Sequence, residues 1–114
     1  MTITEKMNRV EELRNDSFIT YKTAEELQGL LKEIKISDFF RWLHDVKNQS
    51  RCEVDYFYKM MGFTVKGGVL RLNEKLEAAK QGGYVEICYE RKYSRNYKYL
   101  RLTKKGTMLV FPRG

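Results

Sequence analysis

The chain has 114 residues, of which 42% are hydrophobic and 32% are charged, and its formal net charge is +7. These values predict one globular domain with a modest core, and they exclude a chain that is disordered throughout. No apolar run reaches the roughly 20 residues that a membrane helix needs, and the first residues contain no apolar signal core. We therefore expect a cytoplasmic protein with no membrane partner.

Residues that commonly carry catalysis or bind metals are few and isolated. His44 is the one histidine and lies beside Trp42 in an apolar segment, so we expect it to be structural or exposed. Cys52 and Cys88 lack metal-ligand spacing and are expected to be reduced thiols, with a disulfide as the alternative. The sequence contains no phosphate-binding glycine motif, zinc spacing or paired carboxylates, so it predicts no enzyme, no metal and no cofactor.

Two helices are predicted in the first 35 residues. Apolar residues at near-helical spacing predict the first over residues 3–15, and Asn15-Asp16-Ser17 ends it. The sequence from Thr23 to Glu26 is typical of a capping box and predicts the second helix over residues 24–35. The apolar stripe of this second helix consists of Leu27, Leu30, Leu31 and Ile34.

Two further helices are predicted before residue 62. With Ser37 as its N-cap, apolar spacing predicts a helix to about Asn48, and residues 51–53 form either a short strand or an extended link. The next predicted helix covers residues 53–61, and Gly62 is expected after it in the left-handed conformation. Ordinary core packing and an effector pocket are both open for the aromatic residues of this region, which are Phe39, Phe40, Trp42 and Tyr56.

A helix and two strands follow. Thr64 is expected to cap a helix over residues 65–81, which Gly82-Gly83 ends. Alternation of apolar and polar residues predicts a strand from residue 85 to 90 and an antiparallel partner from residue 97 to 102. Thr103 is expected to cap a last short helix.

Positive charge is concentrated in the second half of the chain. Residues 1–57 hold nine basic and eleven acidic residues, a net charge of −2, whereas residues 58–114 hold thirteen and four, a net charge of +9. Between residues 91 and 105 there is no acidic residue, and such an unmixed stretch indicates an anionic partner outside the chain. The seven basic residues of this stretch are Arg91, Lys92, Arg95, Lys98, Arg101, Lys104 and Lys105.

The helices 53–61 and 65–81, joined by a short turn, are typical of a helix-turn-helix. In that motif the N-terminal part of the second helix contacts base edges in the major groove. The residues expected to do so here are Thr64, Lys66, Gly67, Arg71 and Lys75. Gly67-Gly68 allows close approach either of DNA or of a neighbouring helix, and both interpretations stay open.

Two segments in the last third carry a resemblance to a known family. They are LEAAKQGGYVEI at residues 76–87 and, after a basic loop, YLRLTKKG at residues 99–106, which contains L-T-x-x-G. Residues 37–110 thereby resemble winged-helix DNA-binding proteins of the MarR/PadR-like pattern. The resemblance implies an α+β fold, with a winged helix-turn-helix over residues 36–114 and additional N-terminal helices over residues 1–35. Family members usually carry a long dimerisation helix after L-T-x-x-G, whereas eight residues follow Gly106 here, so dimerisation is expected through residues 1–35.

The resemblance also implies a wing whose tip is a loop over residues 91–96. Basic residues in a mobile wing can enter the minor groove, and hydroxyl and amide groups can bond phosphates. The expected wing contacts are Arg91, Lys92, Tyr93, Ser94, Arg95, Asn96 and Lys98. An ordinary solvated hairpin is the alternative. Tyr93, Tyr97 and Tyr99 either stack on single-stranded bases or pack across the sheet.

The leading hypothesis is therefore a cytoplasmic, homodimeric transcription regulator that binds double-stranded DNA sequence-specifically. Residues 65–75 would read the major groove, and residues 91–98 would contact the backbone or the minor groove. One alternative keeps the fold and makes the protein a plasmid or phage partition or replication adaptor that binds repeated DNA sites. Another is a winged helix that binds RNA or an acidic protein. The sequence leaves a small-molecule effector unknown.

Overall fold

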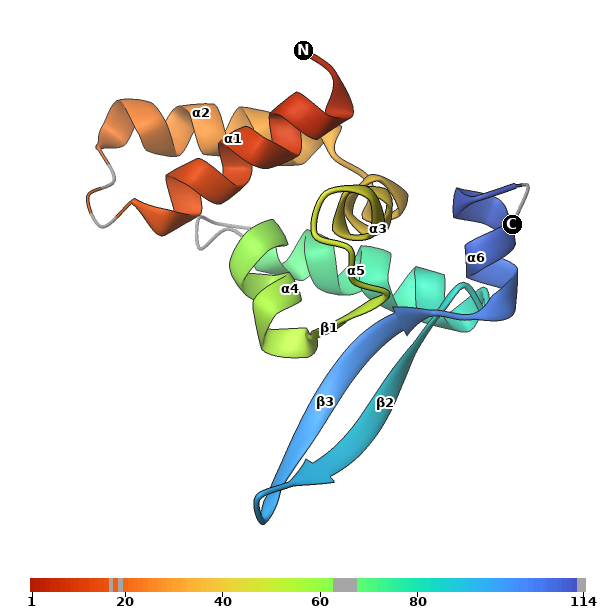
Figure 1. The fold of residues 1–114 in the computed structure, drawn as a ribbon. Coiled ribbons are helices and arrows are strands. Elements are labelled where there is room, and N and C mark those ends of the chain that lie inside the picture. Colours follow the sequence, from red (N-terminus) through yellow and green to blue (C-terminus); the bar gives the residue numbers. More distant parts are fainter. Residues whose placement is uncertain (17, 19, 63–67, 113–114) are drawn as a thin grey trace.

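The computed structural model describes residues 1–16, 18, 20–62 and 68–112, with only the backbone described for 68–71. Over these residues the chain forms six helices and three strands, a mixed α+β fold as expected (Figure 1). The elements are α1 (Ile3–Asn15), α2 (Tyr21–Glu33), α3 (Ile36–Asp45), β1 (Arg51–Glu53), α4 (Val54–Met61), α5 (Gly68–Gln81), β2 (Val85–Lys92), β3 (Arg95–Leu102) and α6 (Lys104–Val110). None of the helices in this described part is long and apolar enough to cross a membrane.

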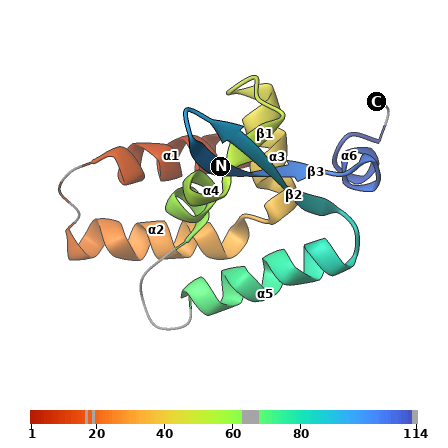
Figure 2. The ribbon, with the colours of Figure 1, turned by 90° about the horizontal axis from the view of Figure 1, so that it is seen from below.

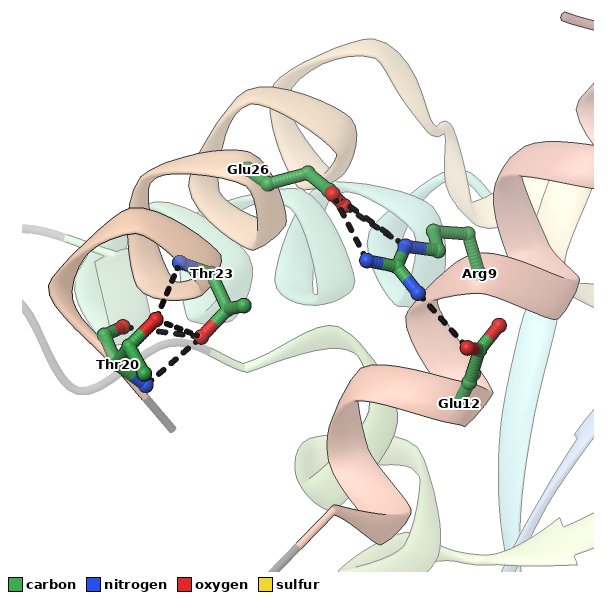
Figure 3. A network of polar contacts seen from close by, with 5 residues as sticks. All are labelled: Arg9, Glu12, Thr20, Thr23 and Glu26. Carbon is green, nitrogen blue, oxygen red and sulfur yellow. Dashed lines mark hydrogen bonds and ion pairs between the residues drawn. The ribbon is translucent and has the colours of Figure 1, made fainter. Parts of the chain in front are cut away.

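The α1 helix has the predicted bounds, whereas α2 begins three residues before its predicted start. Thr20 is the N-cap of α2: its hydroxyl accepts from the backbone N–H of Thr23, and the Thr23 hydroxyl accepts from that of Thr20 (Figure 3). The predicted capping box from Thr23 to Glu26 is wrong, because the Glu26 carboxylate accepts at 2.7 Å from Nε of Arg9 on α1 instead. This ion pair joins α1 to α2, which lie side by side (Figure 2).

The start of α3 also differs from the sequence expectation. Lys35, not Ser37, is the N-cap, and α2 accordingly ends at Glu33. The Asp38 carboxylate accepts at 2.9 Å from the Lys35 backbone N–H, so a side chain of the first turn caps this helix. α3 ends at Asp45, and Asn48, with a φ of 55°, lies in the connection to β1.

The expectation that Gly62 is left-handed is wrong, because its φ is −80°. Glycine is required there for another reason: a Cβ on Gly62 would lie 2.5 Å from the Tyr58 carbonyl oxygen. The left-handed glycine is Gly83, with a φ of 76°, in the turn after α5 where a helix stop was predicted. The predicted Thr64 cap and the first residues of the 65–81 helix lie outside the described residues.

The three strands form one antiparallel sheet in the order β1-β3-β2. β3 is central, and Leu100 faces both Cys52 on β1 and Ile87 on β2. Residues 51–53 are thus a strand, which the sequence left open. Beyond the short β1, the β2–β3 hairpin extends away from the helices (Figure 1).

One core joins the helices to the base of the sheet. Phe39, Phe57 and Leu100 are fully buried in it, and the Trp42 indole N–H donates at 3.0 Å to the Asn8 side chain of α1. The apolar stripes of α1 and α2 are buried in the same core as Met7, Val10, Leu13, Leu27 and Leu30. The N-terminal helices therefore cover the core of the rest of the chain.

Gly106 offers a direct test of how α6 is fixed against the sheet. A Cβ at this buried position would overlap the Tyr84 carbonyl oxygen just before β2. We expect Gly106→Ala to lower the free energy of unfolding by about 1–3 kcal/mol, as overpacking does. Gly29→Ala is the matched control, because a Cβ at Gly29 of α2 has nothing within 4 Å. It should raise stability by about 0.5–1 kcal/mol. Urea unfolding of both variants measures the difference, and equal effects would contradict the close approach at Gly106.

The Arg9–Glu26 pair predicts a pH dependence. The hydrogen bonds from Arg9 hold the pKa of Glu26 below its ordinary value of 4.5. Because the pKa is lower in the folded chain than in the unfolded chain, the pair stabilises the fold above the unfolded pKa. Its contribution is then lost as pH falls through the folded value. Glu26→Gln should therefore lower stability at pH 7 and reduce the loss of stability between pH 7 and pH 3. Urea midpoints across this range measure it, with Glu25→Gln on the exposed side of α2 as control; identical pH profiles for the two variants would contradict the prediction.

Candidate nucleic-acid interface

The β2–β3 hairpin turns over two residues, Tyr93 and Ser94. Both have positive φ, 52° and 63°, as the central residues of a type I′ turn do. The predicted loop over residues 91–96 is therefore too long: Arg91 pairs with Asn96 and Lys92 with Arg95 within the ladder. Tight turns of this type follow the right-handed twist of the strands, so the ladder continues up to them.

Alternation along the strands gives the hairpin an inner and an outer face. The inner face begins in the core with Val85 opposite Leu102 and Ile87 opposite Leu100. Further out, the same face carries four exposed residues, which we call the distal inner face: Tyr89, Arg91, Asn96 and Lys98. Tyr89 is 71% exposed. Among the described residues, Arg91 and Lys98 have no acidic partner, so this surface carries uncompensated positive charge.

The outer face, by contrast, contains its own counter-charges. The Arg101 Nε donates at 2.6 Å to Glu86 on the neighbouring strand. Glu90 lies 2.8 Å from Arg51 and 3.4 Å from Lys92, and these two cations hold its pKa below the ordinary value. The absence of acids between residues 91 and 105 therefore does not by itself require an external anion, because two of these basic residues pair with carboxylates on β2.

Two of the three tyrosines considered for base stacking pack on the outer face. The rings of Tyr97 and Tyr99 lie 6.5 Å apart, and the Arg51 guanidinium lies 4.0 Å from the centre of the Tyr99 ring. The two rings thus pack along β3, and Tyr99 also packs across the sheet against Arg51 of β1. Tyr93 differs from both, because its side chain at the turn is 93% exposed.

The structure tests the helical part of the predicted interface only in part. Thr64, Lys66 and Gly67 lie outside the described residues, and so does the side chain of Arg71. Lys75 is exposed on α5, while Leu72 and Leu76 are buried beneath the helix. The Tyr58 hydroxyl donates at 2.7 Å to Asn73, which ties α4 to α5.

The segment after β3 is held against the turn before β2. Thr103 caps α6, as predicted, by accepting from the Gly106 backbone N–H, and its hydroxyl donates to the Gly83 carbonyl. The Lys105 ammonium donates at 2.9 Å to the Gly82 carbonyl and lies over the Tyr84 ring. Of the seven basic residues from 91 to 105, Lys92, Arg101 and Lys105 thus have partners within the protein.

The remaining candidates do not form a second site with defined chemistry. His44 is exposed beside Asp45, and the aromatic residues Phe39, Phe40 and Trp42 are packed in the core. Tyr56 lines an open depression of about 740 Å³ that also includes Arg51 and Tyr99. Among the described residues, no three His, Cys, Asp or Glu side chains come together as metal ligands would.

Sequence reasoning did not predict that Arg51, Glu86 and Glu90 form ion pairs on the outer face of the hairpin. Arg51 belongs to a three-residue strand, and its place beside Arg101 and near Glu90 follows only from the pairing of β1 with β3. The alternation in β2 did place Glu86 and Glu90 on its polar side, and this was the available signal.

Comparison with protein families, curated proteins and solved structures gave no match. The resemblance to winged helices therefore stays a prediction.

The reactivity of the two cysteine thiols tests which face of the sheet is buried. Cys52 points into the core, and burial raises the pKa of its thiol to about 12, whereas Cys88 lies half-buried on the outer face of β2. Because the thiolate is the reactive form, we expect iodoacetamide to modify Cys88 in the native protein at least tenfold faster than Cys52. Peptide mass spectrometry after timed quenching measures both rates. The Cys88→Ser variant should then react only slowly, and fast labelling of Cys52 in it would contradict the described sheet.

Proposed function

We propose that the chain is a winged-helix protein that binds double-stranded DNA sequence-specifically and acts as a transcription regulator. The element order α3-β1-α4-α5-β2-β3 and the sheet order β1-β3-β2 support this class, because they give a helical pair followed by a projecting hairpin. In this proposal α5 is the recognition helix and the β2–β3 hairpin is the wing.

The observation that carries the proposal is the difference between the two faces of the hairpin. On the outer face, carboxylates pair with Arg51, Lys92 and Arg101, and Arg95 at the tip is the cation without such a partner among the described residues. On the distal inner face, neither Arg91 nor Lys98 has an acidic partner in this part of the chain. This inner face is the one that continues from the core-facing side of the sheet, where the helices pack. A duplex bound here would place phosphates against Arg91, Lys98 and the Asn96 amide.

The proposed protein acts as a homodimer on two half-sites about one helical turn apart. The apolar stripes of α1 and α2 are already buried in the core, so an interface formed by residues 1–35 would use the other surfaces of these helices. Met1, Phe18 and Tyr21, at 73%, 79% and 83% exposure, are large apolar side chains available there.

Selection of bound sequences from a random duplex library, followed by fluorescence anisotropy at increasing salt, tests the proposed function. An enriched palindromic motif is expected. Each lost phosphate contact should reduce the slope of log K against log salt by about 0.9, so Arg91→Ala and Lys98→Ala should each show a shallower slope.

Lys104→Ala is the matched control for net charge, because Lys104 is exposed at the start of α6, outside both the hairpin and residues 1–35. Its slope should equal that of the unmodified protein. Equal slopes for Lys98→Ala and Lys104→Ala would remove the distal inner face as the interface. The absence of any enriched motif, with heparin competing as well as duplex, would refute specific DNA binding.

A further inference from the structure

The tip of the hairpin has an unfavourable composition for its backbone conformation. Both central residues of a type I′ turn need positive φ, and Asn-Gly is the favoured pair. Here the pair is Tyr93-Ser94, with φ values of 52° and 63°. A bulky side chain with a Cβ is disfavoured in this left-handed region, so Tyr93 lowers the stability of its own turn.

Packing within the protein does not offset this strain. The Tyr93 ring is 93% exposed, whereas Tyr97 and Tyr99 pack against each other on the outer face. An exposed aromatic ring held in a strained conformation at the point of a projecting hairpin is a candidate contact residue. Lys92 and Arg95 lie opposite each other in the ladder beside the turn, and Arg95, unlike Lys92, has no acidic partner among the described residues.

We propose that Tyr93 is a wedge that stacks on a base from the minor groove of bound duplex DNA. The inference rests on the proposed function. The minor groove is about 6 Å wide and excludes a helix or a whole β-ribbon, but a single side chain at the turn of a hairpin is narrow enough to enter it. Proteins that bind this groove commonly insert apolar side chains between base steps.

The neighbouring charges define the DNA that the wedge fits. Arg95 favours a narrow, strongly negative minor groove, and the ring favours a step that unstacks easily. The preferred site is therefore an A·T-rich segment that contains a flexible TA or CA step. The ring stacks through its π-face, so its hydroxyl is dispensable. This distinguishes the wedge from a tyrosine that only donates a hydrogen bond to a phosphate, which the sequence predicted for Tyr93 together with the alternatives of stacking on single-stranded bases and packing across the sheet.

Fluorescence of 2-aminopurine tests the wedge on the selected duplex, with the probe replacing each adenine in turn. The unmodified protein should change the fluorescence at one step, because the base there exchanges a neighbouring base for the Tyr93 ring. Tyr93→Phe should retain the signal. Tyr93→Ala should abolish it and weaken binding about tenfold with an unchanged salt slope, since stacking and not charge is removed.

Two variants of the turn separate the wedge from damage to the hairpin. Tyr93→Asn relieves the strain and removes the ring, so it should raise Tm by several degrees while the fluorescence signal is lost. Ser94→Gly relieves the strain at residue 94 and keeps the Tyr93 ring, so it should raise Tm and keep the fluorescence signal.

The possible results of these experiments distinguish a failure of the wedge from a failure of the proposed DNA binding on which it rests. Failure of the unmodified protein to bind any duplex would overturn both. Tight duplex binding with the same fluorescence for Tyr93→Ala as for the unmodified protein would overturn the wedge alone. Loss of signal in Tyr93→Phe as complete as in Tyr93→Ala would also overturn it, because the hydroxyl would then be the group that binds.

Discussion

The central position of β3 is the constraint on which the rest of the structure depends. Its residues pair with β1 on one edge and with β2 on the other, and fully buried Leu100 lies between Cys52 and Ile87. Because side chains alternate along an antiparallel ladder, this one register puts Leu100 in the core and Arg101 on the outer face. Past the end of β1, the same alternation decides which side chains of the hairpin face solvent on each side.

The pattern of charges on the hairpin shows why local pairing matters more than net charge. The protein carries a net charge of +7, yet the basic residues of β3 are not equivalent. Arg101 is held by Glu86, whereas Lys98, three residues away and on the opposite face, has no acidic partner in the described part of the chain. In the proposed complex, Arg91 and Lys98 would meet the phosphates of the DNA on one face of the hairpin, and Tyr93 at the tip would be the first side chain to enter a groove.

Sequence reasoning located most elements correctly, and its errors have physical causes. The bounds of α1 and the Thr103 cap of α6 were predicted, because both depend on residues within one or two helical turns. The start of α2 was wrong because Glu26, the expected capping residue, pairs with Arg9 on another helix. The six-residue wing loop was wrong because strand pairing continues up to a two-residue turn that lacks the usual Asn-Gly signal.

The sequence alone determined the kinds and order of the elements except β1, the antiparallel hairpin and the concentration of positive charge in the second half of the chain. These features depend on periodicity, capping and composition, which are local properties. Only the tertiary structure decided that Arg51 joins the outer face beside Tyr99 and Glu90, and that the uncompensated cations Arg91 and Lys98 share the other face. These relations join residues that are far apart in the chain, and they require the register of β3 with both neighbouring strands, which no local pattern specifies.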